Sequence, residues 1–73
     1  MESVFTAVAD PTRREMLARM QSEGPLSIKQ LAAPLPISRQ AVTKHLDILQ
    51  ASGLVRVQRA GRERLHSLDS SPL

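Results

Sequence analysis

The stretch "ISRQAVTKHLDILQASGLV", residues 37–55, decides the fold because it marks a helix from its start to its end. Ser38 is a typical N-cap residue, and Gly53 is placed to end the helix in a left-handed conformation. Between them, apolar side chains recur at the spacing of one helix face. They are Val42, Leu46 and Leu49. The pattern predicts a helix over about residues 39–52 with one side buried.

The first turns of this helix carry polar groups that the fold does not need. They are Ser38, Arg39, Gln40, Thr43 and Lys44. One interpretation is an ordinary solvated helix face, with Ser38 as a structural cap. A cation at Arg39 is unfavourable there, however, because the helix dipole favours an acidic side chain at the N-terminus. This placement favours a negatively charged partner outside the chain.

Three further N-cap signals predict three helices upstream. The caps are Ser3, Asp10 and Ser27. Asp10 is followed by a proline, and Gln30 stands at capping-box spacing from Ser27. The second helix is expected to end at Gly24 and the third at about Ala33, before two prolines. The apolar side chains are Val4, Phe5 and Val8 in the first helix, Met16, Leu17 and Met20 in the second, and Ile28, Leu31 and Leu35 in the third.

Two β-leaning runs follow the long helix, at about residues 54–59 and 62–68, and flank the dipeptide Ala60-Gly61. Such a dipeptide indicates a two-residue hairpin turn, although less strongly than Asn-Gly does. The predicted order is α-α-α-α-β-β, mainly α with a small β-hairpin, in a single domain over residues 1–73. A short helix, a tight turn, a longer capped helix and a basic hairpin form the layout of a winged helix-turn-helix.

Positive charge is concentrated in the second half of the chain. Residues 1–36 carry as many acidic as basic side chains, whereas residues 37–66 have a net charge of +4, in a chain whose total is +3. Four arginines flank the predicted turn: Arg56, Arg59, Arg62 and Arg64. They can serve solubility or block sheet aggregation, but an uneven positive field also suits a polyanion such as nucleic acid.

The second helix of a helix-turn-helix enters the DNA major groove by its N-terminal end. Arg39 can present its guanidinium to guanine, Gln40 can pair with adenine, and Thr43 can contact a thymine methyl group or a phosphate. Ser38 and Lys44 suit phosphate oxygens, which position a protein without carrying sequence information. The arginines of the hairpin can straddle a phosphate backbone or enter a narrow minor groove.

Several other functions have no candidate residues. The chain has no cysteine, so it offers no disulfide, thiolate metal site or cysteine nucleophile. We interpret His45 and His66 as packing or hydrogen-bonding residues, because a zinc site needs three or four convergent ligands. No catalytic arrangement, phosphate-binding loop or membrane span is predicted. We therefore expect a cytoplasmic protein that is not an enzyme and has no cofactor and no metal.

Four segments together resemble the ArsR-type winged-helix repressors of bacteria: "AVADPTRREML", "GPLSIKQLA", "ISRQAVTKHLDILQASGLV" and "RAGRERLHSLD". The resemblance covers about residues 4–69. It implies a small homodimeric transcriptional repressor that binds a palindromic operator in double-stranded DNA. By position, it places Ser38, Arg39, Gln40, Thr43, Lys44 and His45 on the DNA-reading helix, and Arg59, Gly61, Arg62 and Arg64 on the wing.

The chain also departs from the family. The cysteine motif that metal-sensing members carry near the start of the third helix is missing, so thiol metal sensing is not expected. The family dimerises through its first and last helices, and the sequence stops at Leu73 before that last helix would begin. A dimer then needs the missing helix, or "SVFTAVA" and parts of the second helix must carry it alone.

The alternative to DNA binding is a winged helix used for protein–protein contact. That function predicts apolar anchors on the recognition helix. The sequence has Arg39, Gln40 and Lys44 there instead, which favours DNA.

Overall fold

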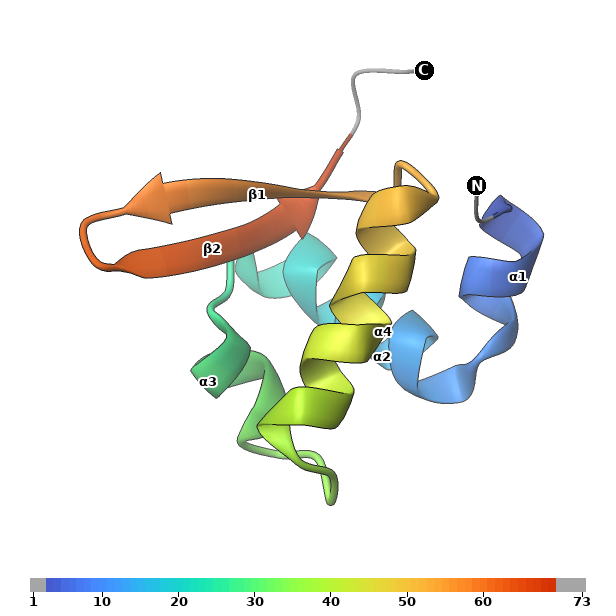
Figure 1. Ribbon diagram of the computed structural model, residues 1–73, viewed down its shortest axis with the longest axis horizontal. Helices are drawn as coiled ribbons and strands as arrows, with labels where there is room; N and C mark the ends of the chain where they lie inside the picture. Colours follow the sequence, from blue (N-terminus) through green and yellow to red (C-terminus); the bar gives the residue numbers. More distant parts are fainter. Residues whose placement is uncertain (1–2, 70–73) are drawn as a thin grey trace.

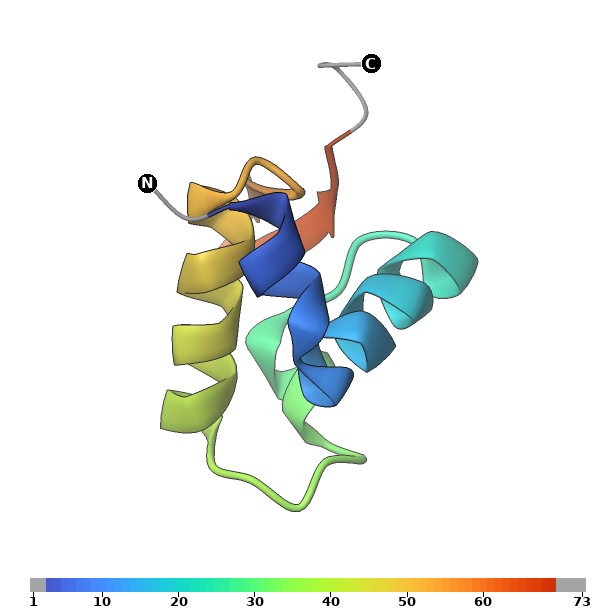
Figure 2. The ribbon, with the colours of Figure 1, turned by 90° about the vertical axis from the view of Figure 1, so that its right-hand side faces the viewer.

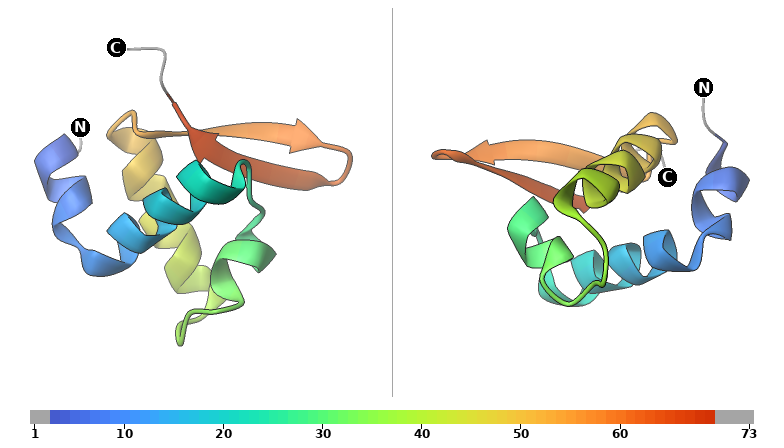
Figure 3. Two further views of the ribbon diagram at one scale, coloured as in Figure 1. Left: turned by 180° about the vertical axis from the view of Figure 1, so that it is seen from behind. Right: turned by 60° about the horizontal axis from the view of Figure 1, so that its bottom comes forward.

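The computed structural model describes residues 3–69 of the chain. Over these residues, four helices precede one antiparallel hairpin (Figure 1). The elements are α1 (Val4–Ala9), α2 (Pro11–Glu23), α3 (Ile28–Ala32), α4 (Arg39–Ala51), β1 (Val55–Ala60) and β2 (Glu63–Leu68). This order confirms the predicted winged helix-turn-helix. The hairpin and α1 lie on opposite sides of the helical body, with α4 between them (Figures 1 and 3). Residues 33–38 join α3 to α4 (Figure 2).

Every helix begins at the side chain that the sequence marks as its N-cap. The four caps each accept a hydrogen bond from the backbone N–H three residues later: Ser3, Asp10, Ser27 and Ser38. The N–H of Ser27 donates in return to Gln30 Oε1 at 2.9 Å, which completes the predicted capping box. The N–H of Arg13 lowers the pKa of Asp10 because it hydrogen-bonds the carboxylate. Short-range bonds therefore determine where each helix starts.

The end of α4 is also fixed by local hydrogen bonds. The N–H of Gly53 donates to Gln50 O at 3.0 Å, and the N–H of Leu54 donates to Leu49 O at 3.1 Å. Gly53 has a φ of 83°, which residues with a Cβ atom rarely adopt. This pair of bonds is a Schellman motif, and it turns the chain directly into β1.

One apolar core joins all the helices to the hairpin. Its buried members are Ala7, Met16, Met20, Leu26, Leu31, Val42, Leu46, Leu49 and Val55. The helix α1 contributes only Ala7 to it. Phe5, expected to be an apolar residue of that helix, is 86% exposed, and Val4 is 47% exposed. Val4 and Phe5 therefore lie on the molecular surface.

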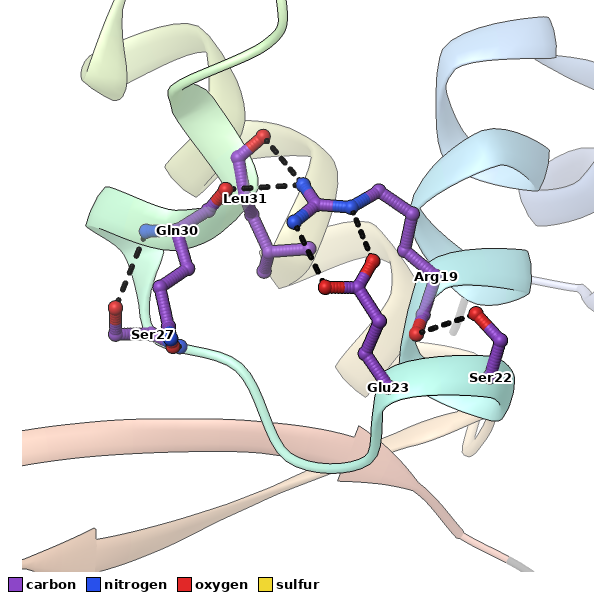
Figure 4. Close-up of polar contacts among 6 residues, drawn as sticks. All are labelled: Arg19, Ser22, Glu23, Ser27, Gln30 and Leu31. Carbon is purple, nitrogen blue, oxygen red and sulfur yellow. Dashed lines mark hydrogen bonds and ion pairs between the residues drawn. The ribbon is translucent and has the colours of Figure 1, made fainter.

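A guanidinium group on α2 holds α3 in place (Figure 4). Arg19 Nη1 donates to Gln30 O at 2.9 Å and to Leu31 O at 3.4 Å, at the C-terminal end of α3. On the other side of this guanidinium, Arg19 Nε donates to the Glu23 carboxylate at 2.9 Å and forms an ion pair with it. The same bond lowers the pKa of Glu23, because it stabilises the carboxylate. Because α3 has five residues, its carbonyls need such partners from outside the helix.

The hairpin turn lies one residue later than predicted. The strand register pairs Ala60 with Glu63, so the turn is Gly61-Arg62 and not Ala60-Gly61. Gly61 has a φ of 65°, and Arg62 has a negative φ. A positive φ at the first central residue alone is typical of a type II′ turn, which requires glycine at that place. The shift puts Arg62 at the tip of the hairpin.

The base of the hairpin is tied to the loop between α2 and α3. Leu26 forms a β-bridge with His66, with N–H to O distances of 2.9 and 2.7 Å. The buried His66 ring also places Nδ1 3.2 Å from Leu26 O. A carbonyl oxygen can only accept, so Nδ1 carries the proton. Burial lowers the pKa of His66, the charge of Arg64 adds to this effect, and the bond to Leu26 opposes it.

This buried ring makes the folding stability depend on pH. The ordinary pKa of histidine is near 6.5 and the folded pKa of His66 is lower, so between the two values the unfolded chain binds more protons. The stability that the neutral ring contributes is therefore complete above about pH 6.5 and is lost as the pH falls toward the folded pKa. We expect the Tm measured by circular dichroism to fall between about pH 8 and about pH 5. His66→Asn keeps a donor without titrating, and it should lose less Tm over this range. An equal decline in both proteins would contradict the prediction.

Candidate nucleic-acid interface

The N-terminal half of α4 presents unpaired polar side chains on the surface. Arg39, Gln40 and Lys44 are exposed, and their side chains make no hydrogen bond or ion pair to any residue in the described range 3–69. Ser38 is exposed as well, and its Oγ accepts from the N–H of Ala41 at 3.1 Å. Three donor or acceptor groups at the start of a capped helix therefore remain available to a ligand.

Thr43 is more constrained than its neighbours. Its hydroxyl donates to Arg39 O at 2.9 Å, one helical turn back. The hydroxyl proton is committed to this bond, whereas the side chain as a whole is exposed. Of the two contacts predicted for Thr43, the thymine methyl group suits this arrangement better than a phosphate, which needs a donor.

The opposite side of α4 anchors it to the core through Val42, Leu46 and Leu49, as the spacing predicts. His45 lies on a flank of the helix and faces the body of the protein. Its Nδ1 is 3.2 Å from Nη1 of Arg13 on α2, and its ring is half-buried. This hydrogen bond agrees with the interpretation of His45 from the residues alone. His45 lies on α4, the helix that the family resemblance implies reads DNA.

The alternation of the strands places two of the four hairpin arginines on the face that packs against the helices. Residues opposite each other in the register share a face, and Arg59 pairs with Arg64. Both belong to the face that carries the buried Val55 and His66. Arg56 pairs with Ser67 on the other face. Arg59 and Arg64 therefore lie side by side as like charges, an arrangement that destabilises the hairpin unless an anion neutralises it.

Two hollows connect the wing to the helix-turn-helix. One, of about 290 Å³, lies between the start of α3 and the hairpin tip, and is lined by Ser27, Ile28, Lys29, Arg62, Glu63 and Arg64. The other, of about 200 Å³, separates α4 from the hairpin, and Thr43, Asp47, Gln50 and Arg64 belong to its lining. Arg64 lines both hollows, so α3, α4 and the hairpin border one another at this place.

Sequence reasoning missed Lys29, Asp47 and Gln50 as members of this surface. Asp47 and Gln50 follow Thr43 at i+4 and i+7, so helical spacing could have identified them. No sequence pattern near Lys29 identifies it as part of this surface. It lines the hollow only because the hairpin folds over α3.

The ten cationic side chains divide into two groups. Three arginines on α2, namely Arg13, Arg14 and Arg19, donate to main-chain carbonyls of other helices. The other seven make no side-chain hydrogen bond or ion pair within the part of the chain that the structure describes. They are Lys29, Arg39, Lys44, Arg56, Arg59, Arg62 and Arg64. Within residues 3–69, every unpaired Lys or Arg side chain therefore belongs to α3, α4 or the hairpin.

Comparison with known proteins agrees with this geometry. A family model described as a helix-turn-helix domain matches residues 8–58. The chain is 32% identical to the transcriptional repressor SdpR of Bacillus subtilis, over 100% of this chain and 80% of SdpR. An ArsR-like transcriptional regulator from Rhodococcus sp. RHA1 has the same fold, with a TM-score of 0.84 and 42% identity over 94% of this chain. This chain belongs to the ArsR family of helix-turn-helix transcriptional regulators.

A further relative extends the comparison. The HTH-type transcriptional regulator Rv2034 of Mycobacterium tuberculosis is 40% identical over 99% of this chain. The chain spans 66% of the length of Rv2034 and 62% of the Rhodococcus structure.

Two kinds of feature are absent from residues 3–69. No group of three or more His, Cys, Asp or Glu side chains is placed to hold a metal ion. No helix in this range has the length and hydropathy needed to cross a bilayer.

The like-charge pair on the wing predicts a gain in stability when it is removed. Arg59→Thr should raise the free energy of unfolding by about 0.2–1 kcal/mol at low salt, because it relieves the repulsion from Arg64. The gain should shrink at about 0.5 M salt, where exposed charges are screened. Urea denaturation at both salt concentrations measures it. Arg56→Thr is the matched control, since Arg56 faces Ser67, and equal behaviour of the two variants would refute the pairing.

Proposed function

We propose that this protein is a bacterial transcriptional regulator that binds double-stranded DNA sequence-specifically and represses its target as a homodimer. The observation that carries the proposal is the location of the unpaired cations. They gather on α3, α4 and the hairpin, while the arginines of α2 are used internally. A surface made only for solubility does not require unpaired cations to be gathered on particular elements. Binding a phosphate backbone does require unpaired cations on the elements that contact it.

Each exposed group on α4 has a role in this proposal. Arg39 reads guanine and Gln40 reads adenine through bidentate hydrogen bonds, and Thr43 contacts a thymine methyl group. Ser38 and Lys44 hold phosphate oxygens. On the wing, Arg59, Gly61, Arg62 and Arg64 follow the DNA backbone or the adjacent minor groove. Lys29 joins Arg62 and Arg64 at the hollow beside α3, where one phosphate can meet three cations.

The exposed face of α1 supports the proposed homodimer. Phe5 and Val4 project from a helix that contributes only one buried residue to its own core. A second copy of α1 would remove these side chains from water. Two recognition helices related by a two-fold axis would meet half-sites about 34–36 Å apart, which implies a palindromic operator. The proposal places the protein in the cytoplasm and requires no catalysis, cofactor or metal.

A winged helix used for protein–protein contact is the second candidate function. It would need apolar anchors on the exposed face of α4. That face carries Arg39, Gln40, Lys44 and Asp47 instead, and Thr43 is its most apolar member. The helix α1, which carries the exposed Val4 and Phe5, lies on the other side of the molecule from the wing (Figure 1). DNA remains the better ligand for α4.

Base readers and phosphate contacts should respond differently to mutation. Arg39→Ala is expected to weaken binding to the preferred sequence by about 1–3 kcal/mol, with a much smaller loss on random duplex. Lys29→Ala and Arg62→Ala should weaken both alike, and each should reduce the slope of log K against log salt by about one. Fluorescence anisotropy, with an operator selected from a random pool and with a scrambled duplex, measures both quantities.

Arg56→Ala is the control for these variants. It removes the same exposed, unpaired charge from the same hairpin, but from the outer face, so its binding should stay near that of the wild type. Equal losses for Arg39→Ala and Arg62→Ala on both duplexes would exclude Arg39 as a base reader. Wild-type protein that shows no salt-dependent binding to any duplex would refute the proposed function.

The dimer is tested separately from DNA. Phe5→Glu should convert the protein to a monomer of 8.0 kDa without unfolding it, because the side chain is 86% exposed. Light scattering gives the mass, and circular dichroism checks the fold. Gln58→Glu adds the same charge to an exposed site on the hairpin and should leave the mass unchanged. A Phe5→Glu protein with the wild-type dimer mass would show that α1 is not the interface.

A further inference from the structure

Arg13 joins three helices through one guanidinium group. Its Nε donates to Ala7 O at 2.7 Å, and its Nη2 donates to Thr6 O at 3.1 Å, both in the last turns of α1. Its Nη1 lies 3.2 Å from Nδ1 of His45, in the middle of α4. Arg13 itself belongs to the first turn of α2, where its backbone N–H donates a hydrogen bond to the N-cap Asp10 at 3.0 Å. Among the described residues 3–69, no other side chain hydrogen-bonds to both α1 and α4.

The hydrogen bond between Arg13 and His45 has a defined donor and a defined acceptor. A guanidinium can only donate hydrogen bonds, so Nδ1 of His45 is the acceptor and the ring carries its proton on Nε2. The planar group has fixed donor directions, and all three donors used here meet acceptors at hydrogen-bond distance. The other supports of α4 are apolar contacts of the core, which are not directional. Arg13 therefore sets an orientation that core packing alone specifies less closely.

The neighbouring arginine provides a natural comparison. Arg14 Nη1 donates to Val8 O at 2.7 Å and to Ala9 O at 3.0 Å, so it also satisfies the C-terminal end of α1. It makes no hydrogen bond to α4. Both arginines thus hydrogen-bond carbonyl groups of α1, and only Arg13 also hydrogen-bonds the recognition helix α4.

We infer that Arg13 is a positioning residue that fixes the recognition helix α4 relative to α1, and thereby sets the spacing between the two recognition helices of the dimer. The inference rests on the proposed function, in which α1 forms the dimer and α4 reads DNA. His45 lies six residues from Arg39, or about 9 Å along the helix axis. A small rotation of α4 about this point displaces the base-reading end. A firm connection from α1 to α4 therefore makes a two-fold dimer selective for one half-site separation.

Half-site spacing distinguishes positioning from a general loss of stability. We would measure the affinity for the selected operator and for versions with one or two base pairs added or removed between the half-sites. The wild type should prefer one spacing. Arg13→Lys keeps the charge but carries its donors on a single nitrogen, which cannot replace the separate Nε, Nη1 and Nη2. His45→Leu removes the acceptor on α4. Both should reduce the ratio of affinities for the best and altered spacings by about threefold to thirtyfold, typical of coupling between contacting residues.

Two variants serve as matched controls. Arg14→Ala loses bonds to α1 only, and His45→Asn keeps an acceptor near the position of Nδ1, so both should retain the wild-type ratio. If Arg13→Lys does not fold, the comparison of His45→Leu with His45→Asn still provides the test. A uniform loss of affinity at every spacing would reduce Arg13 to a structural role and overturn the inference.

A spectroscopic measurement tests the junction without DNA. Long-range ¹H–¹⁵N correlation on the wild-type protein should show His45 protonated at Nε2 and unprotonated at Nδ1, and Arg13→Lys should alter this pattern. A wild-type ring protonated at Nδ1 would refute the hydrogen bond. Failure of the proposed function is recognised separately, because the wild type would then bind no duplex or form no dimer, whatever the state of this ring.

Discussion

Main-chain carbonyls at the ends of very short helices have to be satisfied, and the arginines of α2 satisfy them. The helix α1 has six residues and α3 has five, too few for either to be stable alone. Arg13 and Arg14 bond the end of α1, and Arg19 bonds the end of α3. The longer α2 thus organises both short helices around it. The placement of the helix-turn-helix depends on these bonds as well as on the apolar core.

The arginines of α2 are bonded within the protein, so they differ from the cations that are free to bind a ligand. Counting charges along the chain gives a basic second half, but it treats every arginine as equal. The structure separates cations that donate to carbonyls from cations with no partner in the described residues. The second group includes Lys29, which lies in the half of the chain that has no net charge. Free charge, and not total charge, is what a phosphate backbone would meet.

The hairpin completes the candidate surface because its base is held and its tip is free. The β-bridge between Leu26 and His66 fixes the base to the loop that precedes α3. The II′ turn then extends Arg62 outward, and the strand register places Arg59 beside Arg64. A like-charge pair that costs stability in the isolated protein has a physical rationale in an interface with an anion.

The sequence by itself determined the features that depend on neighbours three or four residues apart. Ser3, Asp10, Ser27 and Ser38 cap their helices, and Gly53 ends α4, because each of these bonds closes within one turn of the chain. The order of elements, the buried stripe of α4 and the exposed groups Arg39, Gln40 and Lys44 follow from the same short-range periodicity.

Only the tertiary structure decided the features that join distant parts of the chain. Arg13 and His45 are 32 residues apart, and Lys29 lines the same hollow as Arg62 and Arg64 only because the hairpin folds over α3. The exposure of Phe5 depends on how α1 is held against α2, and the turn at Gly61-Arg62 depends on the register between two strands. Spacing within one segment carries no information on such contacts, because the packing of whole elements against each other creates them.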